Sequence, residues 1–176
     1  MIIPHDESVS IVSFLTDEET GYKPTQHFVY EVNPYAKIFL DNLPANADTI
    51  SCIPEVEVIS PLKYKMKGWD KVGALLLFEG NHGWWCGSIM DESDSEKLLE
   101  GKYGPTVLQV TGGVFAAFVW ICRNPNRGPN WPEYLDTDEV FENSKAYLGT
   151  LHSDYVDISE TCVKDCFKFE DFLVKN

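Results

Sequence analysis

Hydrophobic positions along the chain change their spacing several times, from continuous or alternating runs to runs that recur every three or four residues. Short runs of the first kind, bounded by turn-forming residues, are typical of β-strands. They occur at residues 10–15, 25–32, 72–78 and 84–90. The last two flank a turn at 79–83, so we expect them to form a hairpin.

Runs of the second kind predict helices at 35–43, 92–99, 105–122 and from 136 or 137 to about 147. The clearest is 105–122, which begins with a proline and carries apolar residues at helical spacing: Val107, Val110, Val114, Phe118 and Ile121. Four small residues of the same segment form a smooth face, where another backbone, that of a partner subunit included, can approach closely: Gly112, Gly113, Ala116 and Ala117.

Weaker patterns occur elsewhere. Residues 55–59 alternate like a half-buried strand, and Lys63, Lys65 and Lys67 alternate like the solvated face of a strand or ribbon. The segment after residue 150 has no clear period. Strands interspersed with helices predict an α+β fold, with a mixed or mainly antiparallel sheet and helices packed on it.

Dinucleotide- and phosphate-binding loops have recognisable glycine patterns. The 176 residues contain neither G-x-G-x-x-G nor G-x-x-x-x-G-K-S/T. We therefore expect no complete Rossmann domain in this sequence.

Charge and composition narrow the class of partner. The chain has 28 acidic and 14 basic residues, a formal net charge of −14, which argues against nucleic acid and anionic membranes as partners. A cationic small ligand is compatible with this charge, although solubility explains the acidity equally well. We see no apolar run of the roughly 18 residues that span a bilayer, and no secretory signal at Met1. We expect a cytoplasmic protein whose five cysteines are free thiols.

Metal and nucleophile signatures are weak. The four histidines form neither H-x-x-x-H nor H-E-x-x-H, so no zincin-type site is predicted. Cys162 and Cys166 with His152 have unusual spacing for a metal site and no obvious fourth ligand. Cys86 near His82 forms at best a weak nucleophile pair, and we predict no metal.

Two tryptophans and three polar side chains are better candidates for binding. Trp84 and Trp85 are adjacent on a predicted strand, so one can face the core and the other a ligand pocket, where its ring can hold an ammonium group. His27 lies among aromatic residues and can carry a proton. His5 and Glu7 place an imidazole beside a carboxylate. Each also has a purely structural interpretation, in sheet packing or on a solvated face.

These segments carry a family resemblance. In order along the chain they resemble motifs of bacterial homospermidine synthases: L-T…Y-R-P-T-x-H-Y-x-Y at 15–30, L-G-x-L-L-M-G…A-W-W-x-G-S at 73–88, A-T-x-L-Q-V-x-x-x-V at 106–114, and N-P-x-x-G and A-K-P-Y-L-G at 124–149. The match runs over about residues 5–157, which we predict to be the family's C-terminal substrate and dimerisation domain, followed by a tail at 158–176.

The resemblance implies polyamine chemistry. The family has a Rossmann domain that holds NAD and a second, α+β domain of saccharopine-dehydrogenase type. NAD takes a hydride from putrescine, ammonia is lost by exchange with a second amine, and the new imine is reduced to homospermidine. Carboxylates and an aromatic face in the pocket suit the ammonium and iminium groups.

By resemblance, the site residues receive roles. Glu7 and Glu31 would bind ammonium groups, His27 would handle protons, and Trp84 or Trp85 would hold a cation; His5 belongs to an H-x-E pattern of the family. The sequence also departs from the family: Glu31 replaces a histidine, and the segment around Asp157 lacks the tryptophan of a D-W-T-P element.

Two classes of function remain open. In the first, the chain is part of a split or partial homospermidine synthase, which needs a Rossmann-domain partner chain and binds no NAD tightly alone. In the second, it is a non-catalytic domain that binds polyamines or serves assembly. A homodimer is compatible with either class.

Overall fold

A computed structural model of the chain describes residues 2–3, 5–43, 62–64, 67–78 and 82–157. The contacts divide it into two compact units. One unit comprises Met1–Val58 with Pro125–Thr137, and the other comprises Ile59–Asn124 with Asp138–Asn176. The elements are α-helices and antiparallel strand pairs, which confirms the α+β prediction. The predicted boundary at residue 157 stays a prediction, because 158–176 lie outside the described residues.

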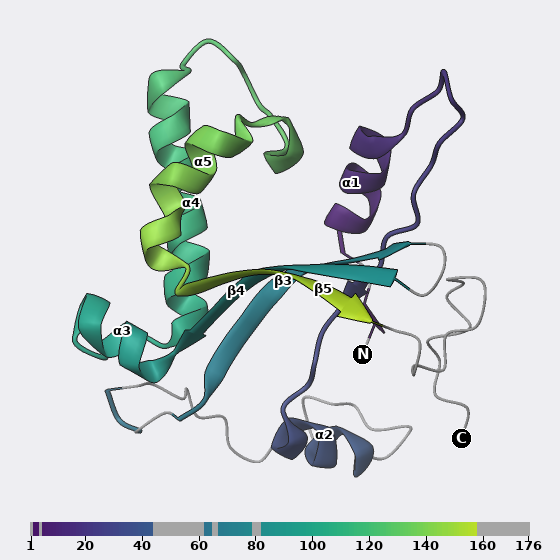
Figure 1. Cartoon of the computed structure of the whole chain (residues 1–176). Helices are drawn as coiled ribbons and strands as arrows, with labels where there is room; N and C mark the ends of the chain where they lie inside the picture. Colours follow the sequence, from purple (N-terminus) through teal and green to yellow (C-terminus); the bar gives the residue numbers. More distant parts are fainter. Residues whose placement is uncertain (1, 4, 44–61, 65–66, 79–81, 158–176) are drawn as a thin grey trace. The chain divides into compact units, whose positions relative to one another are not determined.

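The second unit is built on a three-stranded antiparallel sheet in the order β3-β4-β5 (Figure 1). The strands are β3 (Trp69–Phe78), β4 (His82–Asp91) and β5 (Thr150–Asp157). The predicted hairpin is confirmed, with Leu75 opposite Trp85. Strand β5 was not predicted, and it pairs with β4 so that Asp154 lies opposite Trp85.

Strands β3 and β4 each place a glycine at the same point of their pairing. Gly73 is directly opposite Gly87, and the Trp85 ring lies over both. A Cβ on Gly87 would come within 2.6 Å of the Gly73 Cα and 2.7 Å of Trp85 Cζ2. The tryptophan therefore occupies the space that two side chains would otherwise fill, as aromatic residues do over glycines in other sheets.

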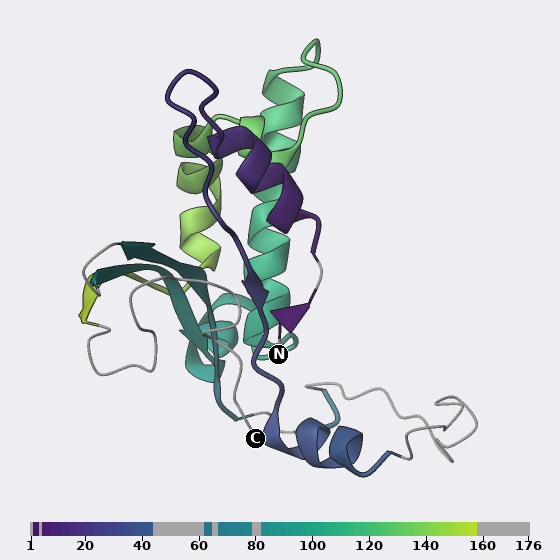
Figure 2. The same ribbon diagram turned by 90° about the vertical axis from the view of Figure 1, so that its right-hand side faces the viewer.

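Three helices belong to this unit: α3 (Glu92–Leu99), α4 (Pro105–Arg123) and α5 (Thr137–Ser144), the last continued by a 3₁₀ turn, η2 (Lys145–Tyr147). Helices α4 and α5 run side by side in both ribbon views (Figures 1 and 2). An ion pair between Arg123 and Glu139, with the atoms 2.8 Å apart, links them. All three helices were predicted from the sequence.

The core of this unit lies where α4 meets β4. Met90 on β4 and Leu108 on α4 are buried in this unit, as are Ala116 and Trp120 further along α4. Gln109 donates from Nε2 to Ser88 Oγ at 3.0 Å, which fixes the helix against the strand. Gly112 approaches the Tyr147 side chain so closely that a Cβ would lie 2.7 Å from it. The predicted smooth face therefore packs, through Gly112 and Ala116, within the same chain.

The apolar side chains whose spacing predicted α4 lie on the opposite face. Val107, Val110, Val114, Phe118 and Ile121 are all exposed. Their spacing predicted the helix, but the residues that pack on the sheet are a different set. Over the described residues, α4 is also long and apolar enough to span a bilayer, with a mean hydropathy of 1.6. The expectation that no segment reaches this length is therefore wrong, although core helices of soluble proteins meet the same criterion. The cytoplasmic location stays a prediction.

The first unit contains two short antiparallel strands, β1 (Ile2–Ile3) and β2 (Phe28–Val29), and the helices α1 (Glu7–Leu15) and α2 (Pro34–Asp41). A 3₁₀ turn, η1 (Pro132–Tyr134), contacts α1. Phe14 meets Tyr134 edge-on with ring centroids 5.0 Å apart, and Ser10 Oγ donates to Glu133 Oε1 at 2.6 Å. Asn33 caps α2 by accepting from the Tyr35 backbone N–H at 2.9 Å.

Several strand predictions were wrong. Residues 10–15 belong to α1, because Phe14 and Ser10 find partners on η1, far away in the sequence. Only Phe28 and Val29 of the predicted strand 25–32 pair as a strand. Residues 62–64 form a turn rather than a lysine-edged ribbon, and the predicted strand at 55–59 lies outside the described residues.

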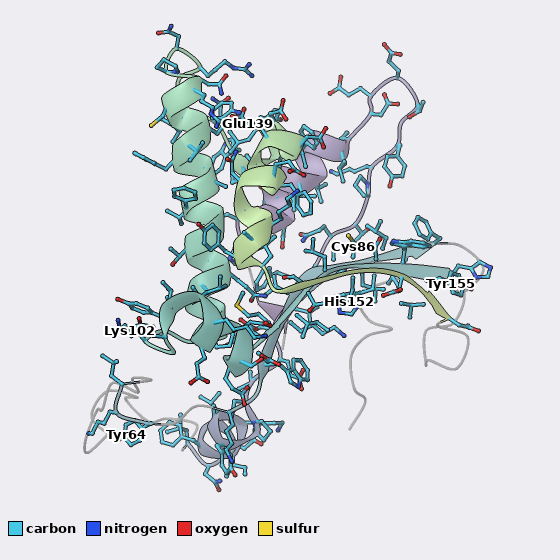
Figure 3. The ribbon with its side chains drawn as sticks, turned by 60° about the vertical axis from the view of Figure 1, so that its left-hand side comes forward. Tyr64, Cys86, Lys102, Glu139, His152 and Tyr155 are labelled. Atoms are coloured by element: carbon cyan, nitrogen blue, oxygen red, sulfur yellow. The ribbon has the colours of Figure 1, made fainter. Side chains whose placement is uncertain are left out.

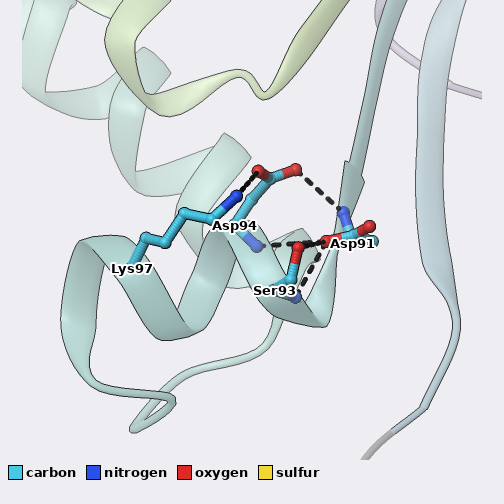
Figure 4. Close-up of polar contacts among 4 residues, drawn as sticks. All are labelled: Asp91, Ser93, Asp94 and Lys97. Atoms are coloured by element: carbon cyan, nitrogen blue, oxygen red, sulfur yellow. Dashed lines mark hydrogen bonds and ion pairs between the residues drawn. The ribbon is translucent and has the colours of Figure 1, made fainter.

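A capping box joins the end of β4 to the start of α3 (Figure 4). The Asp91 carboxylate accepts from the backbone N–H groups of Ser93 and Asp94 at 2.8 and 3.0 Å, and from Ser93 Oγ at 2.7 Å. Asp94 Oδ2 accepts in return from the Asp91 N–H at 3.4 Å. These bonds, the Ser93 hydroxyl first, lower the pKa of Asp91 below its ordinary value.

The glycine pair generates a first prediction. Gly87→Ala should lower the free energy of unfolding by about 1–3 kcal/mol, because a new Cβ forces β3, β4 or Trp85 to move. Gly83→Ala on the same strand is the matched control, since its Cβ would meet neighbours at an ordinary 3.4 Å and should change stability by about 1 kcal/mol or less. Urea denaturation measures both, and equal effects would contradict the packing role.

The capping box generates a prediction about pH. A carboxylate with a lowered folded-state pKa stabilises the fold above its unfolded pKa and loses this effect as the pH falls through the folded value. Asp91→Ala should therefore lower the Tm at pH 7, and the difference from the parent should shrink below about pH 4. Asp138→Ala, which removes an exposed carboxylate from the first turn of α5, is the control. A difference that does not depend on pH would contradict the charged cap.

Candidate functional site

In the first unit, His5 contacts an aromatic ring and a carboxylate. Its ring stacks on Phe28 with centroids 4.2 Å apart and planes 12° apart. Its Nδ1 lies 3.4 Å from Glu7 Oε2, in the first turn of α1. Both side chains are close to half exposed. The predicted imidazole–carboxylate pair is therefore formed, on a rigid aromatic support and open to solvent.

His27 and Glu31 lie on either side of β2. His27 is half-buried, and it directly precedes Phe28, on which His5 stacks. Its neighbour Gln26 has a buried Oε1 atom with no hydrogen-bond partner in the described part of the chain. Glu31 is exposed. The predicted histidine and acid thus flank β2, with different access to solvent.

Trp84 and Trp85 lie on opposite faces of the sheet, as adjacent strand residues must. Trp84 is exposed, and its indole Nε1 donates to Ser153 Oγ at 2.9 Å. Trp85 is half-buried over the glycine pair, and Lys71 Nζ lies 4.6 Å from its ring centroid. The face of Trp85 therefore already holds an ammonium group of this chain.

Strand β5 adds polar side chains that sequence reasoning missed. His82 Nδ1 and Tyr155 Oη are 2.5 Å apart, and His152 Nδ1 lies 3.7 Å from Asp154 Oδ2. Figure 3 labels His152 and Tyr155 on β5, with Tyr155 nearer the end of the sheet, and Cys86 on the neighbouring strand β4. The sequence signal for β5 was weak. After Gly149, apolar residues such as Leu151 are separated by so many polar residues that the pattern does not indicate a strand by itself.

An open hollow of about 430 Å³ lies within the second unit. Its lining is mainly apolar and small: Val72, Cys86, Gly87, Ser88, Phe141, Leu148, Leu151, His152 and Ser153. No carboxylate lines it. It can accept an alkyl chain, but it offers no counter-charge for an ammonium group, and none of the predicted site residues lines it.

Metal and nucleophile chemistry find no support in the described residues. These residues contain no group of three or more histidines, cysteines or acids that could hold a metal. Cys162 and Cys166 lie outside them. His82 and Cys86 are four residues apart on one strand, or about 13 Å, and His82 contacts Tyr155 instead.

NAD does not fit the described residues. A Rossmann site needs a parallel strand, a glycine-rich turn and a helix that starts at the pyrophosphate. Every strand pair within the described ranges is antiparallel, and the glycine pattern is absent from the sequence. We therefore derive no step through a nicotinamide held by these residues.

Comparison with known proteins identifies similar sequences. No family model matches the chain. It is 29% identical over 163 residues to the homospermidine synthase of Blastochloris viridis, and 27% identical over 161 residues to that of Mesorhizobium japonicum. Each match covers 89% of this chain and 32% of the relative, so the chain spans about one third of the curated relatives' length.

A solved structure agrees with the sequence matches. The crystal structure of the homospermidine synthase from Legionella pneumophila in complex with NAD superposes with a TM-score of 0.75 and 26% identity. It matches 95% of this chain and 36% of that protein. The resemblance seen in the sequence motifs is confirmed: over nearly its whole length this chain is similar to homospermidine synthases, and it spans about one third of their length.

Proposed function

We propose that this chain contributes the polyamine-binding part of an NAD-dependent conversion of putrescine to homospermidine. The observation that carries the proposal is the match of 89% of the chain to two homospermidine synthases, together with the same fold in a third. The chemistry of the described residues supports it, since putrescine is a dication and the chain has a net charge of −14.

Among the tryptophans, Trp84 is the better amine-facing residue. Its ring is 41% exposed, and the hydrogen bond to Ser153 holds the ring plane in place. A fixed aromatic face attracts an ammonium group without a further loss of side-chain freedom. Trp85 is the weaker candidate because Lys71 occupies its face and its ring fills the space over Gly73 and Gly87.

The first unit carries its own candidate amine-binding acids in this proposal. Glu7 is held beside His5, whose stacking on Phe28 leaves the carboxylate at a defined place and accessible. Glu31 is exposed and free to follow a flexible diamine. His27, half-buried and directly before Phe28, is the residue we assign to proton transfer, because an imidazole can both accept and donate a proton.

The cofactor must then come from elsewhere. In this proposal NAD is held by residues outside these 176, on a Rossmann-domain partner chain or elsewhere in a longer one, and supplies the hydride chemistry. The chain's own residues bind and orient the amine and move protons. The alternative, a polyamine-binding or assembly domain without catalysis, predicts binding but no turnover.

A reconstitution experiment tests the proposal. The purified chain, putrescine and NAD should give no homospermidine by mass spectrometry. Adding the Blastochloris viridis enzyme from which the matching third has been deleted should restore product, while the deleted enzyme alone should give none. Product from the chain alone would contradict the need for a partner. Absence of product in every arm, with putrescine binding seen by calorimetry, would favour the non-catalytic alternative.

A variant series tests the role of Trp84. Trp84→Leu should weaken putrescine binding by roughly 2- to 30-fold, the equivalent of about 0.5–2 kcal/mol for a cation over an aromatic face. Trp84→Phe should retain most of the affinity because it keeps a ring. Trp131→Leu, which removes another exposed tryptophan, is the matched control. Equal calorimetric affinities for Trp84→Leu and the parent would exclude Trp84 from the site.

A further inference from the structure

The hollow of the second unit lies on the same face of the sheet as Trp84. Alternate residues of a strand share a face, so Trp84, Cys86 and Ser88 of β4 point to the same side. Ser153 lies opposite Cys86 on β5, and Leu151 lies opposite Ser88. All of these except the tryptophan line the hollow, and Trp84 is the next residue of this face beyond Cys86. The exposed ring and the hollow are therefore neighbours on one surface.

A hydrogen bond joins the Trp84 ring to the lining of the hollow. Its Nε1 donates to Ser153 Oγ at 2.9 Å, and Ser153 is a lining residue. Along the strand, Trp84 is about 7 Å from Cys86 and about 13 Å from Ser88. A ligand with its charged end over the Trp84 ring can thus extend a chain into the hollow while it stays on the sheet surface.

The end of the hollow away from Trp84 is built of apolar side chains and an internal hydrogen-bond pair. Ser88 is 6% exposed, and its Oγ accepts from Gln109 Nε2 at 3.0 Å. The same amide donates to the carbonyl of Leu148, another lining residue, at 3.4 Å. Phe141 of α5 adds an aromatic ring to the lining. This end therefore presents apolar surface whose polar groups are engaged within the chain.

The hollow offers no counter-charge to a cation. Within the described chain, no Asp, Glu, Lys or Arg lines it. His152 is a lining residue, but it lies opposite Gly87 and its ring is 6.2 Å from that of Trp85, on the other face of the sheet. An ammonium group that entered the hollow would lose its hydration without gaining a partner, which is costly, whereas a methylene chain gains free energy from burial.

We propose that Trp84 and the hollow form one site for primary alkylamines with a single charge, in which the ammonium group lies over the Trp84 ring and the alkyl chain enters the hollow. The inference rests on the proposed function only in taking Trp84 as an amine-facing residue. A volume of about 430 Å³ is ordinary for a small-molecule pocket. A diamine such as putrescine binds this site by one ammonium group and keeps the other outside the hollow.

Charge favours an amine over other amphiphiles of the same shape. A fatty acid has the same apolar chain, but its carboxylate is repelled by a protein with a net charge of −14. The face of an indole ring also attracts cations and not anions. A neutral alcohol gains the burial of its chain but nothing from the Trp84 ring.

An NMR titration of the full chain, followed through the indole N–H of Trp84, tests the site. Trp84→Phe identifies this signal by removing it. From propylamine to hexylamine, each added methylene should tighten binding by roughly two- to fourfold, because it is buried in the hollow. From putrescine to hexamethylenediamine, chain length should have no such effect. Hexylamine should therefore bind at least about tenfold more tightly than hexamethylenediamine.

Variants of the hollow separate its role from that of the ring. Cys86→Leu fills the space beside Trp84 and should remove the chain-length effect in monoamines while putrescine affinity stays the same. Cys122→Leu, at an exposed cysteine of α4 outside the lining, is the matched control and should keep the effect. Leu151→Asp places a carboxylate in the lining and should tighten the binding of hexamethylenediamine by about tenfold.

Each outcome decides the inference. Equal chain-length effects in monoamines and diamines, or an effect that survives Cys86→Leu, overturn the site, and Leu151→Asp provides the second reading if circular dichroism shows that Cys86→Leu is unfolded. A response of the Trp84 signal to putrescine but not to hexylamine overturns the site and leaves the proposed function standing. Hexanoate that binds more tightly than hexylamine overturns it in favour of an anionic amphiphile. Failure of the homospermidine reconstitution, with the chain-length effect present, refutes the proposed function alone.

Discussion

The orientation of α4 depends on one polar contact inside an apolar layer. Gln109 is buried, and its amide donates to Ser88 on β4 at 3.0 Å and to the Leu148 carbonyl at 3.4 Å. A buried amide is costly to leave unbonded, so the helix cannot rotate about its axis without losing both bonds. Gly112 adds a steric condition, because only a residue without Cβ allows the approach of Tyr147. Together they decide which face of α4 is packed and which is open.

Local signals explain what the sequence could predict. The β3–β4 hairpin and helices α3, α4 and α5 depend on residues close together along the chain, and their turn, cap and spacing patterns are visible in it. Strand β5 depends instead on pairing with β4, many residues away. Its mixed polar sequence does not indicate a strand, and it becomes one because β4 provides the backbone partners. Helix α1 was misread for the same reason: a short apolar run fits a strand or a helix, and Ser10 finds Glu133 at a separation of 123 residues.

The sequence predicted which residues belong to the candidate site better than it predicted their contacts. The His5–Glu7 pair and the opposite orientations of Trp84 and Trp85 follow from local geometry, and both are present in the structure. That Lys71 covers Trp85, and that Ser153 anchors Trp84, required the sheet register. Those two contacts distinguish two tryptophans that the sequence left equivalent, since one face is occupied and the other is open.

The same reasoning applies to α4. Helical periodicity alone shows that a helix has an apolar side, and it assigns that side to the core by default. Here the packed side carries Leu108, Gln109, Gly112, Ala116 and Trp120, while the apolar residues whose spacing predicted the helix remain exposed. Periodicity therefore located the helix, and the contacts of Gln109 and Gly112 were needed to show which of its sides is packed.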